Sequence, residues 1–411
     1  MPNKNESPVS NESSLMSNTA YIRFWVARLF TAAANQMLSV AVAWQIYQIT
    51  GSAMDIGLVG LFQFLPPIFL IATSGNMADT HDRKMLALVS QAVQVGVLTA
   101  FLTLTLLHEI DRQWIFFLIA VSGAARTFQM PATSSLLPTL VPTSQLAKAI
   151  AMSASGIQAA FIVGPALAGI LYTFGEGVVY GTTLALSISA LIGFLAIPPT
   201  THVRMPAEGG EWKKFIDGLR FIRGQRVVLG AISLDLFAVL FGGATALMPV
   251  LANEQLHAGP WALGLMRSAP AVGALLMSAV LARMPLKRSV GHIMFVSVII
   301  YSIATIGFGL STSLWISLPL LATLGAADMV SVVIRGSLVQ LQTPDHMRGR
   351  VSAVNSIFIG ASNQLGEFES GVTAAWFGVV PAIVLGGVCS LTVTTLWMRW
   401  FPQLLRAEKL T

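Results

Sequence analysis

The tetrapeptide Gly123-Ala-Ala-Arg126 recurs as Gly325-Ala-Ala-Asp328, 202 residues further along the chain. The same shift relates the whole stretch 123–169 to 325–371 without a gap. Further matching residues share this spacing: Ser135 and Ser337, Leu136 and Leu338, Pro142 and Pro344, Lys148 and Arg350, Gly164 and Gly366, Gly169 and Gly371. The chain therefore consists of two related halves. An internal repeat in a hydrophobic protein is typical of transporters whose halves move against each other.

The beginnings of the two halves match in a second register, at a shift of 207 residues. Arg28-Leu-Phe30 corresponds to Asp235-Leu-Phe237, and Gly57-Leu58 corresponds to Gly264-Leu265. The repeat thus gives the residues in these stretches an equivalent in the other half. Arg28 and Asp235 are such a pair, with opposite charges.

The composition predicts a membrane protein. Hydrophobic residues make up 55% of the 411 residues and charged residues only 10%, with a mean hydropathy of +0.72, whereas soluble domains carry about 25% charged residues. A membrane-spanning helix needs about 20 mostly apolar residues. Twelve blocks qualify: 22–49, 53–76, 85–107, 113–139, 146–173, 177–198, 226–252, 259–283, 290–311, 314–341, 349–375 and 379–401. We expect an all-α membrane protein of twelve transmembrane helices in two pseudo-symmetric six-helix halves.

This pattern divides the chain into five segments. We expect a disordered cytoplasmic tail over 1–20, a six-helix bundle over 21–198, a linker over 199–225, a second six-helix bundle over 226–401 and a cytoplasmic tail over 402–411. The first tail is polar and has no apolar segment of the kind that signal peptides contain. Apolar residues recur in the linker at helical spacing, which predicts a short amphipathic helix on the membrane surface that tethers the halves: Trp212, Phe215, Leu219 and Ile222.

The basic residues predict the orientation of the chain. With twelve spans both ends lie on one side of the membrane. The connections on that side contain thirteen Lys and Arg residues, whereas the opposite connections contain only Arg112 as a clear case. By the positive-inside rule both termini are cytoplasmic. The net charge of +6 reflects this asymmetry and does not indicate a nucleic-acid partner. The single cysteine, Cys389, excludes an intrachain disulfide.

Three short motifs accompany the twelve spans. The connection after the second span contains Gly75, Asp79, Arg83 and Lys84, which is similar to the pattern G-x-x-x-D-R-x-G-R-R/K, with Thr80 and Asp82 as departures. The fourth span carries Arg126 and Gln129, similar to R-x-x-Q-G, with a proline near the glycine position. The fifth span carries Gly164, Pro165 and Gly169, similar to G-x-x-x-G-P-x-x-G-G, with the first glycine misplaced and Ala168 in place of another.

Together these motifs resemble the major facilitator superfamily over the whole chain. The ending Asp82-Arg83-Lys84 and the stretch 343–351 are similar to the branch that contains siderophore exporters. The resemblance implies the major facilitator fold, in which spans 1, 4, 7 and 10 line a central cavity, and it implies transport of a small solute.

Each motif also has a physical interpretation. Asp79, at the end of the second span, can accept hydrogen bonds from a neighbouring helix N-terminus or a basic side chain, and we expect it to latch the two halves together. Arg83 and Lys84 either belong to this latch or only follow the positive-inside rule. Gly164-Pro165 removes one backbone donor and permits close helix approach. It predicts either a bend that shapes the cavity or a simple packing kink.

Charges within the spans are the strongest functional signal, because each costs about 2.5–3.5 kcal/mol on insertion scales. The set is Arg28, Arg126, Asp235, Arg267, Asp328, Arg335, Glu367 and Glu369. In the repeat, Arg28 corresponds to Asp235 and Arg126 to Asp328, so the first half supplies cations where the second supplies anions. This favours ion pairs between the halves that form in one state and break in another, with Arg126 and Asp328 facing the central cavity. The alternative is that each charge is satisfied within its own half.

Helical spacing predicts which other polar residues share a helix face with these charges. Asn35 shares a face with Arg28, Gln129 lies near Arg126, and Arg335 lies two turns after Asp328. Glu367 and Glu369 are two residues apart and project about 200° from each other, so we do not expect both to face one cavity. Burial of a carboxylate favours its protonated form, which makes these two glutamates our candidates for proton coupling. The alternative is hydrogen bonding to Arg335 or to helix ends.

The sequence therefore predicts a secondary active transporter, a proton-coupled antiporter that exports an organic solute such as a siderophore or an amphiphilic drug by alternating access. An uptake carrier or a lysolipid flippase of the same fold is the alternative, and a non-transporting receptor or scaffold is a third possibility. We expect no enzymatic activity, no cofactor and no metal site, because there is no P-loop and His81 and His346 have no clustered ligands. The expected partners are a small organic substrate, protons and lipid. We expect a monomer in the bacterial inner membrane.

Overall fold

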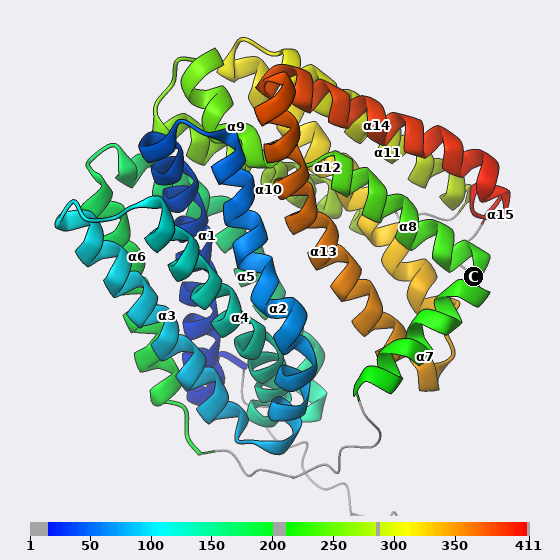
Figure 1. Cartoon of the computed structure of the whole chain (residues 1–411). Helices are drawn as coiled ribbons and strands as arrows, with labels where there is room; N and C mark the ends of the chain where they lie inside the picture. The colour runs from blue at the N-terminus through cyan, green and yellow to red at the C-terminus, as the bar shows by residue number, and fades with distance from the viewer. Residues whose placement is uncertain (1–14, 200–210, 285–287, 409–411) are drawn as a thin grey trace, which may run out of the picture.

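The structure is a computed structural model that describes residues 15–199, 211–284 and 288–408. These residues form helices and connecting turns, without a strand in the described part of the chain. The first bundle contains α1 (Thr19–Thr50), α2 (Ala53–Thr80), α3 (Arg83–Leu106), α4 (Arg112–Leu140), α5 (Thr143–Tyr172) and α6 (Glu176–Leu195). The second contains α8 (Arg226–Phe241), α10 (Pro260–Arg283), α11 (Val290–Leu310), α12 (Leu314–Leu341), α13 (Asp345–Phe377) and α14 (Val379–Trp400). Figure 1 shows the two bundles side by side.

Six short segments complete the described chain: η1 (Leu15–Ser17), α7 (Glu211–Gly224), η2 (Ala244–Leu247), α9 (Met248–Val250), η3 (Leu251–Gln255) and α15 (Pro402–Leu405). Within the described residues, eleven helical stretches are long and apolar enough to cross a membrane, and one of them runs from α8 through η3. The twelfth long helix, α13, has 33 residues but carries more polar side chains. The predicted all-α architecture of two six-helix halves is confirmed.

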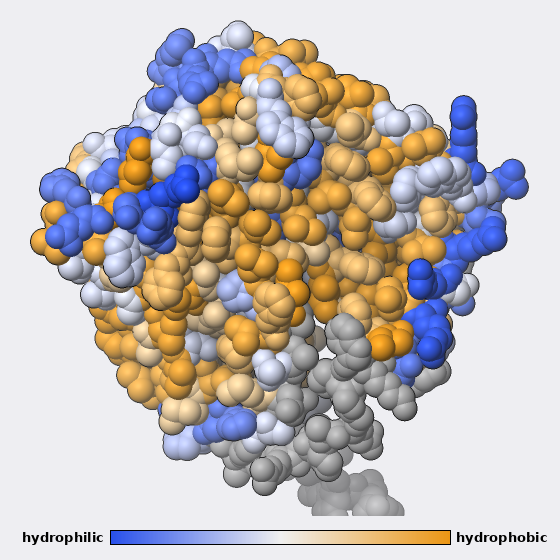
Figure 2. Space-filling view, in the orientation of Figure 1, coloured by the Kyte–Doolittle hydropathy of each residue, from blue (hydrophilic) through white to orange (hydrophobic). Residues whose placement is uncertain are grey.

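The surface matches this arrangement. In Figure 2 an apolar band covers the middle of the visible face, and hydrophilic side chains gather toward its ends. An apolar belt of this kind is the surface that a bilayer core requires. Large apolar side chains are exposed on the surface of the protein, among them Phe69, Trp315 and Trp376. The chain is a multi-pass integral membrane protein.

Polar residues at the predicted connections begin several of the spans. Asn18, Ser52, Asp82 and Asp111 each cap a helix, because their side-chain oxygens accept backbone hydrogen bonds from the first turns of α1, α2, α3 and α4. Asp82 departs from the motif of the second connection, and the structure gives the reason: its carboxylate caps α3 through the backbone N–H groups of Lys84 and Met85.

The seventh span is interrupted, whereas the sequence predicts one continuous helix over 226–252. The helix α8 ends at Phe241, and the chain continues through Gly242 and Gly243 into η2, α9 and a π-helical turn, η3. A β-carbon on Gly243 would overlap the backbone of Gly366 in α13. The Tyr301 hydroxyl donates to the carbonyl oxygen of Gly242 at 3.1 Å, which satisfies one backbone group that the interruption frees.

Segments at both ends of the chain pack onto the bundles. Residues 1–14 of the predicted tail lie outside the described structure, but Leu15 is 2% exposed and packs into the first bundle. Near the other end, Leu404 in α15 is buried, and the backbone N–H of Gly291 donates to the carbonyl oxygen of Ala407 at 3.0 Å. The described part of the predicted N-terminal range, residues 15–20, therefore packs against the first bundle.

The linker helix α7 belongs to the second bundle. Its residue Ile222 is fully buried and packs with Val351 and Val354 of α13. Arg350 of α13 donates to the carboxylate of Asp217 in α7 at 3.2 Å. The predicted amphipathic helix is present, and its apolar face covers α13 and α8.

The two bundles meet along two equivalent helix pairs, α2 with α13 and α5 with α10. Each contact is made by glycines: a β-carbon on Gly371 would lie 2.8 Å from the α-carbon of Gly57, and one on Gly264 would lie 3.0 Å from the α-carbon of Gly169. These four glycines are repeat equivalents, since Gly57 matches Gly264 and Gly169 matches Gly371. Gly57 lies near the start of α2 and Gly371 near the end of α13. In Figure 1, α2 and α13 separate toward the face where α7 lies.

Candidate substrate cavity and buried charges

A polar cavity lies between the two bundles. Its empty volume, part of which is open to solvent, is about 460 Å³. The first bundle contributes Asn35 and Ser39 from α1, Gln63 from α2 and Arg126 from α4. The second bundle contributes Arg267 from α10 and Glu367 from α13. The predicted site residues Asn35, Arg126 and Glu367 thus converge on one place.

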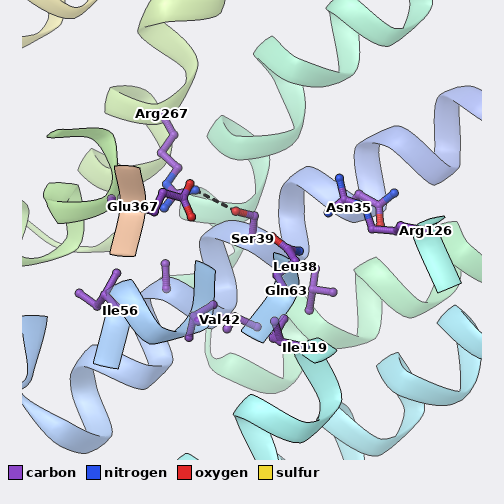
Figure 3. Close-up of a pocket in the computed structure, with 13 residues that line it drawn as sticks. Asn35, Leu38, Ser39, Val42, Ile56, Gln63, Ile119, Arg126, Arg267 and Glu367 are labelled. Atoms are coloured by element: carbon purple, nitrogen blue, oxygen red, sulfur yellow. Dashed lines mark hydrogen bonds between the residues drawn. The ribbon is translucent and has the colours of Figure 1, made fainter. Parts of the chain in front are cut away.

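The cavity holds two arginines and one glutamate from three different helices. The guanidinium of Arg267 donates to the Ser39 hydroxyl at 2.8 Å, which links the second bundle to the first. Figure 3 shows Glu367 beside Arg267, and Arg126 beside Asn35. Arg126 is exposed to the cavity, and both arginines are the electrostatic neighbours of Glu367. With one more cation than anion among these three side chains, the cavity can bind an anionic or hydrogen-bond-accepting group.

Arg267 was part of the intramembrane charge set but did not stand out as a site residue from the sequence. The equivalent position in the first half is uncharged, so the repeat did not indicate that Arg267 has a functional role. The repeat could have pointed to another contact between the halves. Tyr47 and Glu254 are equivalent positions, 207 residues apart, and the Tyr47 hydroxyl donates to the Glu254 carboxylate at 2.5 Å. Repeat equivalents can meet in this way where they lie on the pseudo-twofold axis between the halves.

Asp235 forms its ion pair within its own half, so the expected pairing with the first half is wrong for this residue. Its carboxylate lies 3.2 Å from the guanidinium of Arg335, and the two side chains are 7% and 4% exposed. Arg335 also donates to Asn355 of α13 at 3.1 Å. Arg28 lies over the ring of Phe24, 5.7 Å from its centroid, and forms no ion pair with the described residues.

Asp328 does not line the central cavity, in contrast to our expectation. It lines a separate pocket inside the second bundle with Asp235, Tyr301 and Ser331. The physical reason is its spacing from Arg335: seven residues place both on one face of α12, and that face is turned toward α8. Repeat equivalence with Arg126 fixes the position of Asp328 along its helix but not the direction of its side chain.

Gln129 lies in a buried network of neutral side chains inside the first bundle. Its amide donates to the side-chain oxygen of Gln91 at 2.6 Å, and Gln91 donates to the Ser187 hydroxyl at 2.8 Å. Thr31 of α1 donates to the same oxygen of Gln91 at 2.9 Å. Gln129 therefore joins α4 to α1, α3 and α6 and is absent from the cavity lining.

Two members of the motif after the second span contact the ends of other helices. Arg83 donates to the carbonyl oxygen of Ser135 at 3.2 Å, and Lys84 donates to the carbonyl oxygens of Leu195 and Ile197. Cations at helix C-termini are favourably placed with respect to the helix dipole. Gly75 and the Asp79 side chain lie outside the part of the chain whose packing the structure describes, so the predicted latch stays a prediction.

The motif in the fifth span serves helix packing. The helix α5 continues past Pro165 without interruption to Tyr172. Gly164 faces Ala33 and Gln36 of α1, whereas Gly169 faces α10 across the interface between the bundles.

Glu369 lies apart from the cavity and accepts a hydrogen bond from Thr373 at 2.9 Å. Of the two glutamates on α13, only Glu367 is among the residues that line the cavity. Within the described residues, no three His, Cys, Asp or Glu side chains cluster as metal ligands.

A family model described as "Transmembrane secretion effector" matches residues 11–409 of the chain. The chain belongs to this family of major facilitator transporters. Among curated relatives, the transporter is 24% identical over 408 residues to the enterobactin exporter EntS of Escherichia coli strain K12, and the match covers 96% of both chains. It is 25% identical over 347 residues to EntS of Citrobacter koseri, covering 84% of this chain and 82% of the relative.

Solved structures show the same fold at low sequence identity. A point mutant of the nucleoside transporter NupG matches with a TM-score of 0.76 at 12% identity, covering 93% of the transporter and all of that chain. A bacterial homologue of the human lysosomal transporter Spinster, in an inward-facing and unoccupied conformation, matches with a TM-score of 0.75 at 13% identity. The match covers 95% of the transporter and 99% of that chain. A bacterial homologue of the iron transporter ferroportin, also inward-facing, matches with a TM-score of 0.69 at 17% identity. The match covers 94% of the transporter and 99% of that chain.

Proposed function

We propose that the transporter is a proton-coupled antiporter that exports an organic solute by alternating access. One observation carries this proposal: a polar cavity lies between two bundles, and both bundles supply charged side chains to it, Arg126 from the first and Arg267 and Glu367 from the second. A site built from both halves is made and broken when the halves rock. The similarity to enterobactin exporters supports a siderophore-like solute, and the transporter acts as a monomer in the bacterial inner membrane with both ends cytoplasmic.

Arg126 is the proposed substrate contact. It is exposed to the cavity and has no ion-pair partner within 4.0 Å among the described residues, so its guanidinium is free to bind an oxygen-rich solute. Asn35 and Gln63 supply neutral donors and acceptors on the same side of the cavity. Arg267 differs, because Ser39 already accepts one of its hydrogen bonds.

Glu367 is the proposed coupling residue. It lies between arginines of both halves at the level of the cavity, and it forms no hydrogen bond within the described residues. When it is ionised, its carboxylate can accept hydrogen bonds from a donor group of the solute or from an arginine, and protonation weakens these contacts. Proton and solute then compete for the same carboxylate, and this mutually exclusive binding is what an exchanger requires.

Solute flux in proteoliposomes with an imposed pH gradient tests both roles. Arg126→Ala should reduce export about 10- to 100-fold, which corresponds to the loss of one charge-assisted hydrogen bond of about 1.5–3 kcal/mol. Arg220→Ala is the matched control, because the Arg220 side chain is 79% exposed on α7, and it should leave export unchanged. Export at the parental rate by well-inserted Arg126→Ala would refute the substrate contact.

Glutamine at the coupling site preserves the shape of the side chain and removes its titration. Glu367→Gln should therefore abolish the response of export to the pH gradient while solute binding persists. Glu369→Gln, on the same helix but outside the cavity, should respond to the gradient as the parent does. If both variants follow the gradient, the coupling proton is carried elsewhere.

A further inference from the structure

A second pocket lies inside the second bundle, apart from the central cavity. Its empty volume is about 220 Å³, and it shares no lining residue with the central cavity. Its polar lining consists of Asp235 from α8, Tyr301 from α11, and Asp328 and Ser331 from α12. Neither the family model nor the relatives assign a role to this pocket.

The charges around this pocket do not balance. Arg335 is 4% exposed, and its two terminal nitrogens are committed to Asp235 at 3.2 Å and Asn355 at 3.1 Å. Asp328 forms no ion pair or hydrogen bond within the described residues, and its charged neighbours are Asp235 and Arg335. Tyr301 is the titratable neighbour on α11. One arginine therefore faces two carboxylates inside a helix bundle, where an uncompensated charge costs several kcal/mol.

The pocket offers few ligands for a metal ion. Hard cations take about six or more oxygen ligands. Here the Asp235 carboxylate is held by Arg335, and the Tyr301 hydroxyl donates to Gly242. The Ser331 hydroxyl donates to the Asp235 carboxylate at 3.5 Å, so among the polar lining groups only the Asp328 carboxylate has no hydrogen-bond partner within the described residues. A proton needs one carboxylate alone.

We propose that Asp328 binds a single proton and that this pocket is a second ion site of the transporter, separate from the central cavity. With the proton bound, Asp328 is a neutral carboxylic acid, and Arg335 pairs with Asp235 as the structure shows. When the proton leaves to water, the Asp328 carboxylate competes with Asp235 for the same guanidinium. The exchange alters the contact between α8 and α12.

The interrupted span connects this site to the central cavity. Tyr301 lines the pocket and also donates to Gly242, where α8 ends. The adjacent Gly243 packs against the backbone of Gly366, directly before Glu367 of the cavity. A change in the pocket therefore acts on the one span of the second bundle that already lacks continuous helical hydrogen bonds.

Infrared difference spectroscopy of the purified full-length protein in lipid nanodiscs tests this proposal. A pH titration should show the carbonyl band of a protonated carboxylic acid at neutral pH. Asp328→Asn should remove this band, whereas Glu367→Gln should keep it. Retention of the band in Asp328→Asn would overturn the proposal. The measurement needs no transported solute, so its outcome is independent of the export activity proposed above.

Two further arms keep the test decisive. Asp235→Asn should also remove the band, because Arg335 then pairs with Asp328 and holds it ionised. A band that persists in Asp235→Asn would contradict the competition for Arg335, even where Asp328→Asn cannot be purified. Replacing choline chloride with sodium chloride at constant pH should leave the band unchanged, and its loss on sodium addition would assign the pocket to a metal ion instead.

Discussion

The interiors of the two bundles occupy equivalent places in the fold but are built from different chemistry. In the first bundle, Thr31, Gln91, Gln129 and Ser187 join α1, α3, α4 and α6 through neutral hydrogen bonds. In the second, Asp235, Arg335 and Asn355 join α8, α12 and α13 through an ion pair and a charge-assisted hydrogen bond. The duplication preserves the position of a polar core and not its charge.

This difference separates two tasks. A neutral network has one stable arrangement, because its amides and hydroxyls do not titrate at physiological pH. A charged network can change partners when a proton binds or leaves. The hydroxyls of Ser302 and Ser390 lie 2.9 Å apart between α11 and α14, so the second bundle also has a neutral contact between the helices that follow the order of α3 and α6 in the first. The second bundle therefore adds charges to a shared scaffold.

The largest expected effect is the loss of the buried arginine of the second bundle. Arg335→Ala leaves Asp235 as an unpaired buried charge and should lower the free energy of unfolding by about 3–5 kcal/mol. Gln129→Ala breaks the neutral network and should cost about 1–3 kcal/mol. Denaturant unfolding of both purified variants measures the two losses of unfolding free energy. Equal losses would contradict the claim that the two interiors differ in their energetics.

The two glycine contacts between the bundles should respond alike to substitution, because the bundles differ in their interiors and not at their interface. Valine at Gly57 or Gly264 introduces a side chain where the backbone of the opposing helix lies within about 3 Å of the added β-carbon. Each substitution should cost about 1–3 kcal/mol through overpacking and should reduce export, because the glycine contacts can no longer close. Gly96→Val is the control, since no atom lies within 4 Å of a β-carbon there. A loss from only one of the two glycines would show that the interface itself is asymmetric.

The smallest expected effect concerns the linker helix. The pair Asp217–Arg350 joins α7 to α13, with side chains that are 27% and 40% exposed. Partly exposed pairs contribute about 0.2–1 kcal/mol, so Asp217→Asn should change the free energy of unfolding by no more than that. The buried apolar contact of Ile222 should hold α7 in place. Detachment of α7, seen as new protease cleavage in 211–224, would show that the ion pair and not the apolar face anchors the linker.

Several parts of the fold followed from local features of the sequence. Hydropathy located the spans, and the structure then showed that Ser52, Asp82 and Asp111 cap the helices that begin after them. The interruption of the seventh span was missed, because Gly242-Gly243 within an apolar run is compatible with a continuous helix. Its cause is the close packing of Gly243 against α13, and a partner more than a hundred residues away leaves no local signal.

The candidate site was predicted only in part. Arg126 and Glu367 were identified because charges at membrane depth are costly, and both line the cavity. Asp328 was placed with them by repeat equivalence, yet it lines a different pocket. Equivalence gives the depth of a residue along its helix, whereas the rotation of the helix decides which space the side chain enters.

The sequence by itself determined that this protein is a duplicated bundle of membrane-spanning helices, since hydropathy and repeat register are properties of the chain in one dimension. It also determined which residues are equivalent: Gly57 meets Gly371 in one contact between the bundles, and their equivalents Gly264 and Gly169 meet in the other. Only the tertiary structure decided that Asp235 pairs with Arg335 and that Arg267 reaches Ser39 across the cavity. A buried charge takes the partner that helix packing brings within hydrogen-bond distance, and that proximity is set by the assembled bundle.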